Sequence, residues 1–165
     1  MKLEELKFAP LNDLVKNYAL LTSGDKDKYN TMTISWGGFG TIWNKPVVTV
    51  YVKPIRYTYK FIEDNDYFTV SFYDDEYKDD LIILGTKSGK DIDKISLTKL
   101  NPMFLDNSVS FEEAKITLVC KKIYYQDLNL ELIKENLSSD IYNRFYGNDP
   151  VHRMYIGEVI DIIKK

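Results

Sequence analysis

Small hydroxyl side chains recur at every second position of one short segment, residues 30–36, which reads Asn-Thr-Met-Thr-Ile-Ser-Trp. In an extended strand this spacing places Thr31, Thr33 and Ser35 on one face, and the apolar side chains, including Trp36, on the other. A row of hydroxyls can bind the polar edge of a flat heterocycle, and it is also typical of an ordinary polar strand surface. The segment begins with Asn30, and the glycines that follow it would let the backbone approach such a ring closely.

A second group of residues, further along the chain, is suited to an anion. Lys53 ends an apolar alternating segment, and Arg56, Tyr57 and Thr58 begin a predicted helix over residues 56–64. A guanidinium group, a hydroxyl and the free first-turn amides of a helix together suit a phosphate monoester. An ordinary capped helix explains the same residues, so these residue types alone leave both interpretations open.

Other chemistry-bearing residues are better explained by structure. Residues 37–40 lack the dinucleotide-binding fingerprint and are interpreted as a turn, and residues 85–90 miss the spacing of a phosphate-binding loop. The only cysteine, Cys120, lies in an apolar strand and is predicted to be buried. The only histidine, His152, has no recognisable Ser-His-Asp or Cys-His arrangement around it, so a structural role is the simpler interpretation. No metal-ligating constellation is visible.

Composition limits the classes of protein and partner. The chain has 165 residues with 44% hydrophobic and 28% charged residues, which fits one globular domain over residues 1–165. A net charge of −3 argues against a nucleic-acid-binding surface. One cysteine excludes an intrachain disulfide, and no signal-peptide pattern or apolar run of about 18 residues is present. We therefore expect a cytoplasmic protein with no nucleic-acid or membrane partner.

The elements that must position these residues are mostly strands. Alternating patterns predict six strands, at residues 18–22, 29–36, 47–53, 67–73, 115–125 and 154–163. Helical periodicity predicts helices at residues 56–64, 75–84 and 91–100, and one broken helix or two over residues 128–145. Many strands with few short helices predict a mainly β antiparallel barrel with helical insertions.

Three segments in this order resemble a known family. The segment NTMTISWGGFGTIWNKPVVTVYVKPIRYTY resembles the core of the flavin reductase-like, FMN-binding split-barrel family, in particular its flavoredoxin-like branch. LGTKSGKDIDKI, from Leu84 to Ile95, resembles that branch's glycine- and lysine-containing segment. FEEAKITLVCKKI and HRMYIGEVIDI, which begin at Phe111 and His152, resemble its two closing strands.

The resemblance implies a six-stranded, antiparallel split β-barrel of Greek-key type with short helical insertions. It also implies a homodimer with noncovalent FMN near the subunit interface, NADH or NADPH as reductant, and a partner oxygenase or other electron acceptor. Thr31, Thr33, Ser35 and Trp36 would lie beside the ring system and ribityl chain. The phosphate would be surrounded by Lys53, Arg56, Tyr57 and Thr58. The remaining expected contacts are Asn30, Ser88, Lys94 and, near the flavin or nicotinamide pocket, His152.

Three functions remain open at this point. The first is an NAD(P)H-dependent flavin reductase, in which hydride transfer to FMN needs no catalytic acid or base from the protein. The second is an FMN electron carrier that another protein reduces, which is compatible with the absence of a readable site for the adenine half of a dinucleotide. The third is a barrel that has lost the flavin and serves as an interaction module.

Overall fold

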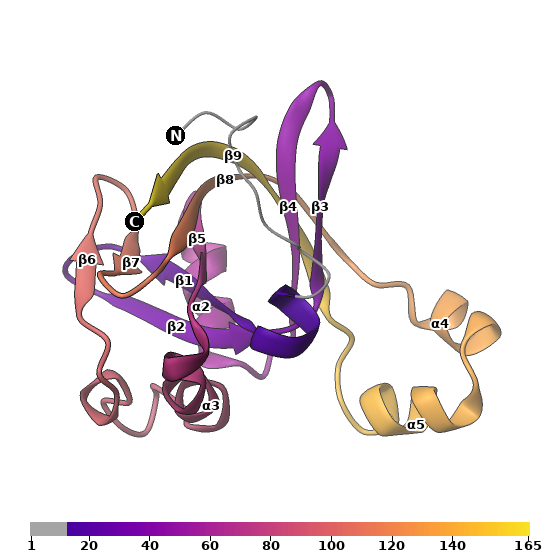
Figure 1. Cartoon of the computed structure of the whole chain (residues 1–165). Coiled ribbons are helices and arrows are strands. Elements are labelled where there is room, and N and C mark those ends of the chain that lie inside the picture. Colours follow the sequence, from indigo (N-terminus) through magenta and orange to yellow (C-terminus); the bar gives the residue numbers. More distant parts are fainter. Residues whose placement is uncertain (1–12) are drawn as a thin grey trace.

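The computed structural model describes residues 13–165, and its main feature is an antiparallel sheet of seven strands (Figure 1). The strand order is β2-β1-β5-β8-β9-β4-β3. The strands are β1 (Ala19–Gly24), β2 (Tyr29–Ile34), β3 (Gly37–Ile42), β4 (Lys45–Val52), β5 (Tyr67–Phe72), β8 (Ile116–Asp127) and β9 (Arg153–Lys164). The sheet is not closed, since no pairing joins β2 to β3 among the described residues. The predicted mainly β split-barrel class is confirmed.

Alternation along the strands builds the core. In β4, Val48, Val50 and Val52 are almost completely buried, while Thr49 and Tyr51 between them are half-buried. These valines face apolar residues of β1, β5, β8 and β9 in one cluster. A second cluster includes Leu20 of β1, Leu81 of the helix α3 (Lys78–Thr86) and Phe111 of the short strand β7 (Val109–Phe111). Burial of these side chains from water is the main force that holds the sheet in its curved form.

The large sheet has seven strands where six were expected, because the interpretation of residues 37–40 as a turn is wrong. Those glycines begin β3, which pairs with β4 from Gly37↔Val50 to Ile42↔Lys45. The actual turn lies at Trp43 and Asn44, whose positive φ angles of 51° and 57° suit a tight hairpin. β3 lies at the edge of the sheet, where glycine needs no packing partner, which explains why the strand carries no clear apolar pattern.

Helices fill the connections between strands. The helix α2 (Tyr57–Asp64) packs on the sheet through Phe61 and Ile62, and α3 (Lys78–Thr86) follows a short 3-10 turn and covers β2. The predicted helix over residues 91–100 is wrong, since only a 3-10 turn at Ile95–Leu97 forms there. Asp93 explains the difference, because its carboxylate accepts the amide of Ser96 and stabilises a turn instead. A second sheet, β6 (Pro102–Phe104) with β7 (Val109–Phe111), was not predicted.

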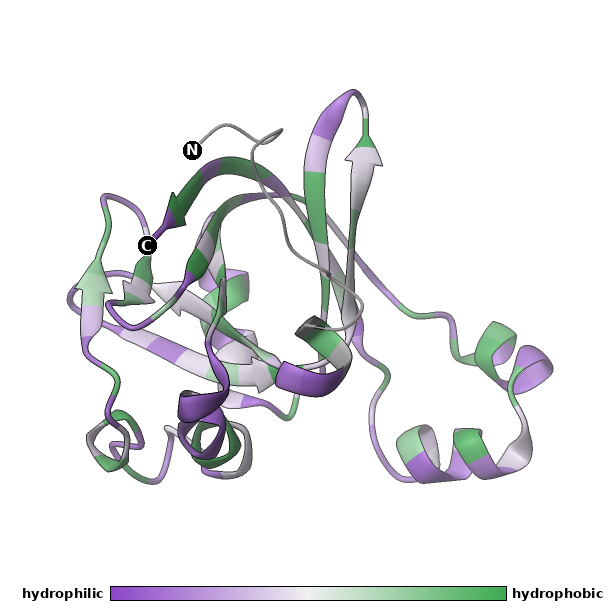
Figure 2. Cartoon of the chain, viewed as in Figure 1, coloured by the Kyte–Doolittle hydropathy of each residue, from purple (hydrophilic) through white to green (hydrophobic). Residues whose placement is uncertain are grey.

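Residues 128–152, which we call the arm, leave the sheet between β8 and β9. The arm carries α4 (Leu130–Asn136) and α5 (Ser139–Tyr146), as the broken helical pattern predicted, and Figure 1 shows both extending away from the strands. Leu132 and Ile141 are 56% and 44% exposed, and Figure 2 shows hydrophobic segments on both arm helices. Within residues 13–165, no helix is long and apolar enough to cross a membrane.

Candidate functional site

Two hollows lie side by side where β2, the end of β4 and the start of α2 meet. They share Met32, Ile55 and Arg56. The larger, of about 240 Å³, is bounded by Trp36, Phe145 and His152, and we call it the aromatic hollow. The smaller, of about 90 Å³, is bounded by Arg56, Lys87 and Lys94, and we call it the basic hollow. The two adjoining hollows thus present a charged end and an aromatic end.

The start of α2 forms one wall of the basic hollow. Arg56 precedes the helix in an extended conformation (φ −80°, ψ 132°), and its side chain does not cap the first turn. Tyr57 and Thr58, the first two helical residues, line the hollow. The Tyr59 amide of this turn donates to the Arg56 carbonyl oxygen at 2.9 Å, so only the amides of Tyr57 and Thr58 precede the first hydrogen bond of the helix. The helix dipole favours negative charge at this end. Arg56 and these amides therefore suit an anion, as the sequence predicted.

Lys94 forms the opposite wall from a buried position. It is only 4% exposed, and its ammonium donates to the carbonyl oxygens of Leu84 (2.8 Å) and Lys87 (3.2 Å) at the end of α3. Burial, and then the nearby Arg56, lower the pKa of Lys94 to about 8. An ammonium has three donors, so one remains for a ligand. An anion in the basic hollow would offset both effects on the pKa.

The floor of the basic hollow is made by Asn30 and Thr58. Asn30 Nδ2 donates to Thr58 Oγ1 at 2.7 Å, and the two side chains are 7% and 1% exposed. Gly89 lies directly against Asn30, since a Cβ at this position would be only 2.2 Å from Asn30 Oδ1. The Thr58 hydroxyl thus accepts from Asn30 and keeps its own proton for donation. Glycine at position 89 is required by this close approach.

Aromatic side chains surround the larger hollow. The Trp36 ring, 39% exposed, lies 4.7 Å from the His152 ring at an interplanar angle of 37°, and 5.0 Å from Phe145 in an edge-on arrangement. His152 Nδ1 is 3.3 Å from the hydroxyl of Tyr146. Burial, followed by the charges of Lys53 and Arg56, lowers the pKa of His152 to about 4. The imidazole is therefore neutral at neutral pH, and the aromatic hollow can hold a flat, weakly polar ring.

Lys53 lies in the aromatic hollow and not in the basic hollow where the sequence interpretation placed it. Its ammonium donates to the carbonyl oxygen of Phe145 and to Asp149, both at 2.7 Å. These contacts attach the arm to the end of β4. They depend on the fold of the arm, which no local pattern around Lys53 indicates.

The row of hydroxyls on β2 is divided among different tasks. Thr31 is 1% exposed, and its hydroxyl bonds to Thr22 Oγ1 (2.9 Å) and the Leu21 carbonyl (3.2 Å) in the neighbouring strand. It lines a third hollow next to Asn30 and Lys94, whereas Thr33 lines the aromatic hollow and donates to a carbonyl of α3. Because β2 ends at Ile34, strict alternation stops there, and both Ser35 and Trp36 line the aromatic hollow.

Several lining residues had no separate signal in the sequence. Lys87 and Gly89 belong to the segment 84–95 and accompany the predicted Ser88 in the basic hollow. Phe145 and Asp149 come from the arm and reach the aromatic hollow only through tertiary structure. The described part of the chain contains no cluster of His, Cys, Asp and Glu that could hold a metal ion.

Comparison with known proteins adds a family match over most of the chain. The family model described as "Flavin reductase like domain" matches residues 11–164. No curated protein matches. Among solved structures, flavoredoxin from Methanosarcina acetivorans is similar with a TM-score of 0.69 and 21% identity, covering 90% of this chain and 68% of that one.

Two further structures have the same fold. Flavoredoxin of Desulfovibrio vulgaris (Miyazaki F) has a TM-score of 0.68 and 21% identity, over 90% of this chain and 69% of that one. An FMN-binding protein from Thermus thermophilus has a TM-score of 0.68 and 18% identity, over 89% of this chain and 69% of that one.

Proposed function

Because the chain belongs to the flavin reductase-like domain family, we propose that its two adjoining hollows bind one FMN noncovalently and that the protein is an oxidoreductase acting through this flavin. The observation that carries the proposal is the junction of the two hollows at Arg56. A basic end suits a phosphate monoester, and an aromatic end suits a flat ring. FMN carries these two groups at the ends of a flexible chain.

The residues present fit this cofactor. Arg56, the first turn of α2 and the third donor of Lys94 would hold the phosphate, with Ser88 beside it. Trp36, Ser35 and Thr33 would lie along the ring system. The combined size of the two hollows falls at the lower end of the roughly 300–1,000 Å³ that is usual for small-molecule sites.

The chemistry would come from the flavin and the orientation from the protein. When bound, FMN accepts a hydride from a reductant, for which we propose NADH or NADPH, and passes electrons to a partner oxygenase or another acceptor. His152 is neutral, so it would offer a hydrogen bond and a ring surface to the reductant without placing a charge there. Lys53 is held by Asp149 and the Phe145 carbonyl, so its own charge is compensated within the aromatic hollow.

An anaerobic visible spectrum of the FMN-loaded protein, recorded before and after NADH and then NADPH, tests this function. Bleaching by either nucleotide at a rate well above that of free FMN is the expected result. A bound flavin that neither nucleotide bleaches would replace the reductase proposal with the electron-carrier role. Protein that takes up no FMN would refute both and leave the interaction module.

We also propose that the protein is a homodimer. The arm side chains of Leu132, Leu137 and Ile141 are 56%, 39% and 44% exposed, and they support a contact with a second copy because such a contact would remove them from water. Light scattering at micromolar concentration with FMN bound should give twice the chain mass of 19.3 kDa. A mass of one chain would refute this part of the proposal.

A further inference from the structure

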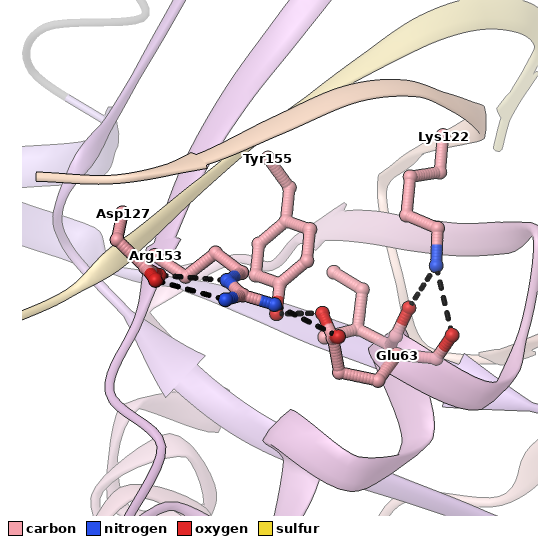
Figure 3. Close-up of polar contacts among 6 residues, drawn as sticks. Glu63, Lys122, Asp127, Arg153 and Tyr155 are labelled. Atoms are coloured by element: carbon pink, nitrogen blue, oxygen red, sulfur yellow. Dashed lines mark hydrogen bonds and ion pairs between the residues drawn. The ribbon is translucent and has the colours of Figure 1, made fainter.

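The root of the arm is closed by an arginine and a carboxylate. Asp127 is the last residue of β8 and Arg153 the first of β9, and the two are paired across the strands. Arg153 Nε and Nη2 donate to the two carboxylate oxygens of Asp127 at 2.7 and 2.9 Å (Figure 3). The amide of Leu128 donates to the His152 carbonyl at 3.0 Å. A bidentate pair of this kind fixes the orientation of both side chains.

The same guanidinium also reaches α2. Its Nη1 donates to Glu63 Oε2 at 2.9 Å, and the hydroxyl of Tyr155 donates to Glu63 Oε1 at 2.6 Å. The Arg153 guanidinium lies over the rings of Tyr59 and Tyr125, at 5.6 and 5.1 Å from their centres. Arg153 therefore connects α2 to the root of the arm. The first turn of α2 lines the basic hollow, and Phe145 and His152 of the arm line the aromatic hollow.

The helix α2 has anchors that do not depend on Arg153. Lys122 donates to the carbonyl oxygens of Ile62 (2.6 Å) and Glu63 (3.0 Å) at its end. Ser23 donates to the Phe61 carbonyl at 3.2 Å, and the Phe61 and Ile62 side chains are buried. Loss of Arg153 should therefore leave α2, and the basic hollow, in place.

The arm has far fewer anchors. No side chain of α4 is buried, and in α5 only Tyr146 is. Apart from its root, the described arm is attached through Lys53, through the buried Tyr146, whose ring centre is 5.7 Å from the Lys53 ammonium, and through the contacts of Trp36 with Phe145 and His152. A segment of 25 residues with so little buried surface depends strongly on the pair that closes its root.

We propose that Arg153 is a positioning residue: through Asp127 and Glu63 it holds the arm at a fixed angle to α2, so that Phe145 and His152 form the wall of the aromatic hollow. The description of that wall as a flavin and reductant contact rests on the proposed function. The positioning itself is a property of the polypeptide and can be measured without a ligand.

Trp36 provides the direct test, because the arm residues Phe145 and His152 cover its ring. The chain has two tryptophans, so Trp43→Phe leaves Trp36 as the only one. In that background, Arg153→Gln and Asp127→Asn should each shift Trp36 emission to the red and raise its acrylamide quenching constant. Lys45→Gln is the matched control, since it removes a β4–β9 ion pair with Glu158 far from the arm, and it should change neither quantity.

Asp127→Asn keeps the test informative if Arg153→Gln folds poorly. The Asp127 side chain is 51% exposed, and its replacement leaves the Arg153–Glu63 contact intact. Near-ultraviolet circular dichroism and the urea midpoint should establish that each variant is folded. Unchanged Trp36 quenching in a folded Asp127→Asn or Arg153→Gln variant would overturn the proposal, even if the variant is less stable, because Arg153 would then be a structural residue only.

Flavin affinities supply the second readout. If the arm alone is displaced, the affinities for riboflavin and FMN should fall by the same factor in Arg153→Gln, about three- to tenfold, as expected for a partly exposed bidentate pair. The ratio of the two affinities, which reports the phosphate contribution, should stay constant. A fall in FMN affinity with unchanged riboflavin affinity would overturn the proposal and assign Arg153 to the basic hollow. If neither flavin binds the wild type, the proposed function fails, while the Trp36 result still decides the positioning role.

Discussion

Replacement of Gly89 by alanine should damage the basic hollow although it adds a single methyl group. The new Cβ would lie 2.2 Å from Asn30 Oδ1 and 3.6 Å from Tyr57 Cδ1. Asn30 cannot turn away freely, because it is 7% exposed and its amide nitrogen donates to Thr58 Oγ1 at 2.7 Å. Either the segment at Gly89 must move outward or the Asn30–Thr58 hydrogen bond must break. Both outcomes disturb the walls proposed to hold phosphate.

The magnitude follows from these two outcomes. Overpacking of a buried position costs about 1–3 kcal/mol, and loss of a neutral hydrogen bond about 0.5–1.5 kcal/mol. Part of this free energy will be lost from the stability of the folded protein. We expect a further loss of at least 1.4 kcal/mol in FMN binding, or about tenfold in affinity. Urea unfolding and titration of flavin fluorescence measure the two quantities separately.

Gly40→Ala is the control for the added methyl group, since no atom of the described residues lies within 4 Å of a Cβ at that position of β3. A double variant, Asn30→Ala with Gly89→Ala, tests the specific contact. Removal of the Asn30 side chain should make the Gly89 substitution much less harmful, which gives a clear coupling energy. If Gly89→Ala binds FMN as well as Gly40→Ala does, or if the two substitutions in the double variant are additive, this account of the basic hollow is wrong.

Three further predictions concern titration, packing and reactivity. The pKa of His152 is about 4 in the folded protein and near 6.5 in the unfolded chain, so the unfolded chain takes up the proton first as the pH falls. The free energy of unfolding should therefore decrease from pH 6.5 to about 4. Urea midpoints of His152→Gln, measured over the same range, should lack this decrease. Gly157→Ala would place a Cβ 2.4 Å from Phe68 Cζ and 2.8 Å from Cys120 Cβ, so its urea midpoint should show a loss of about 1–3 kcal/mol or more, and a wild-type midpoint would contradict the packing. Burial raises the pKa of the Cys120 thiol, so a disulfide reagent should react only after unfolding, and rapid reaction of the native protein would contradict this.

Most of the fold could be predicted from the sequence, because burial on one side of a sheet leaves a period-2 record. The valines of β4 are the clear example. In β5 the apolar residues also alternate with Thr69 and Ser71, although these two are buried as well. β3 left no such record: its glycines carry no side chain to bury, and its partner strand β4 supplies the hydrogen bonds. The hairpin β6–β7 was missed for a related reason, since three-residue strands are too short to show a period.

The helix expected at residues 91–100 shows a different limit. Its apolar spacing suits a helix, but the Asp93 carboxylate accepts one hydrogen bond, from the Ser96 amide, within a short turn. The tertiary contact of Lys94 with Leu84 and Lys87 fixes the chain in that form. Local periodicity cannot report a contact with residues that precede the segment.

The candidate site also combines residues that the sequence could indicate with residues that it could not. Arg56, Tyr57 and Thr58 could be predicted because a helix start and its flanking residues are adjacent in sequence. Thr31 and Lys53, for which the family resemblance implies cofactor contacts, also make contacts that the sequence does not indicate: Thr31 is bonded within the sheet and Lys53 holds the arm. The arm residues of the aromatic hollow come from a part of the chain that reaches β4 only after folding, so no spacing in the sequence indicates them.

Comparison of FMN with riboflavin tests the central claim most directly. The two flavins differ only in the phosphate, and Arg56→Ala removes the side chain that joins the two hollows. The wild type should bind FMN much more tightly than riboflavin. In Arg56→Ala this preference should fall by about tenfold or more, the loss expected for a charge-assisted contact of about 1.5–3 kcal/mol, while riboflavin affinity stays close to that of the wild type. An equal preference for FMN in both proteins would show that the phosphate lies elsewhere and would contradict the account.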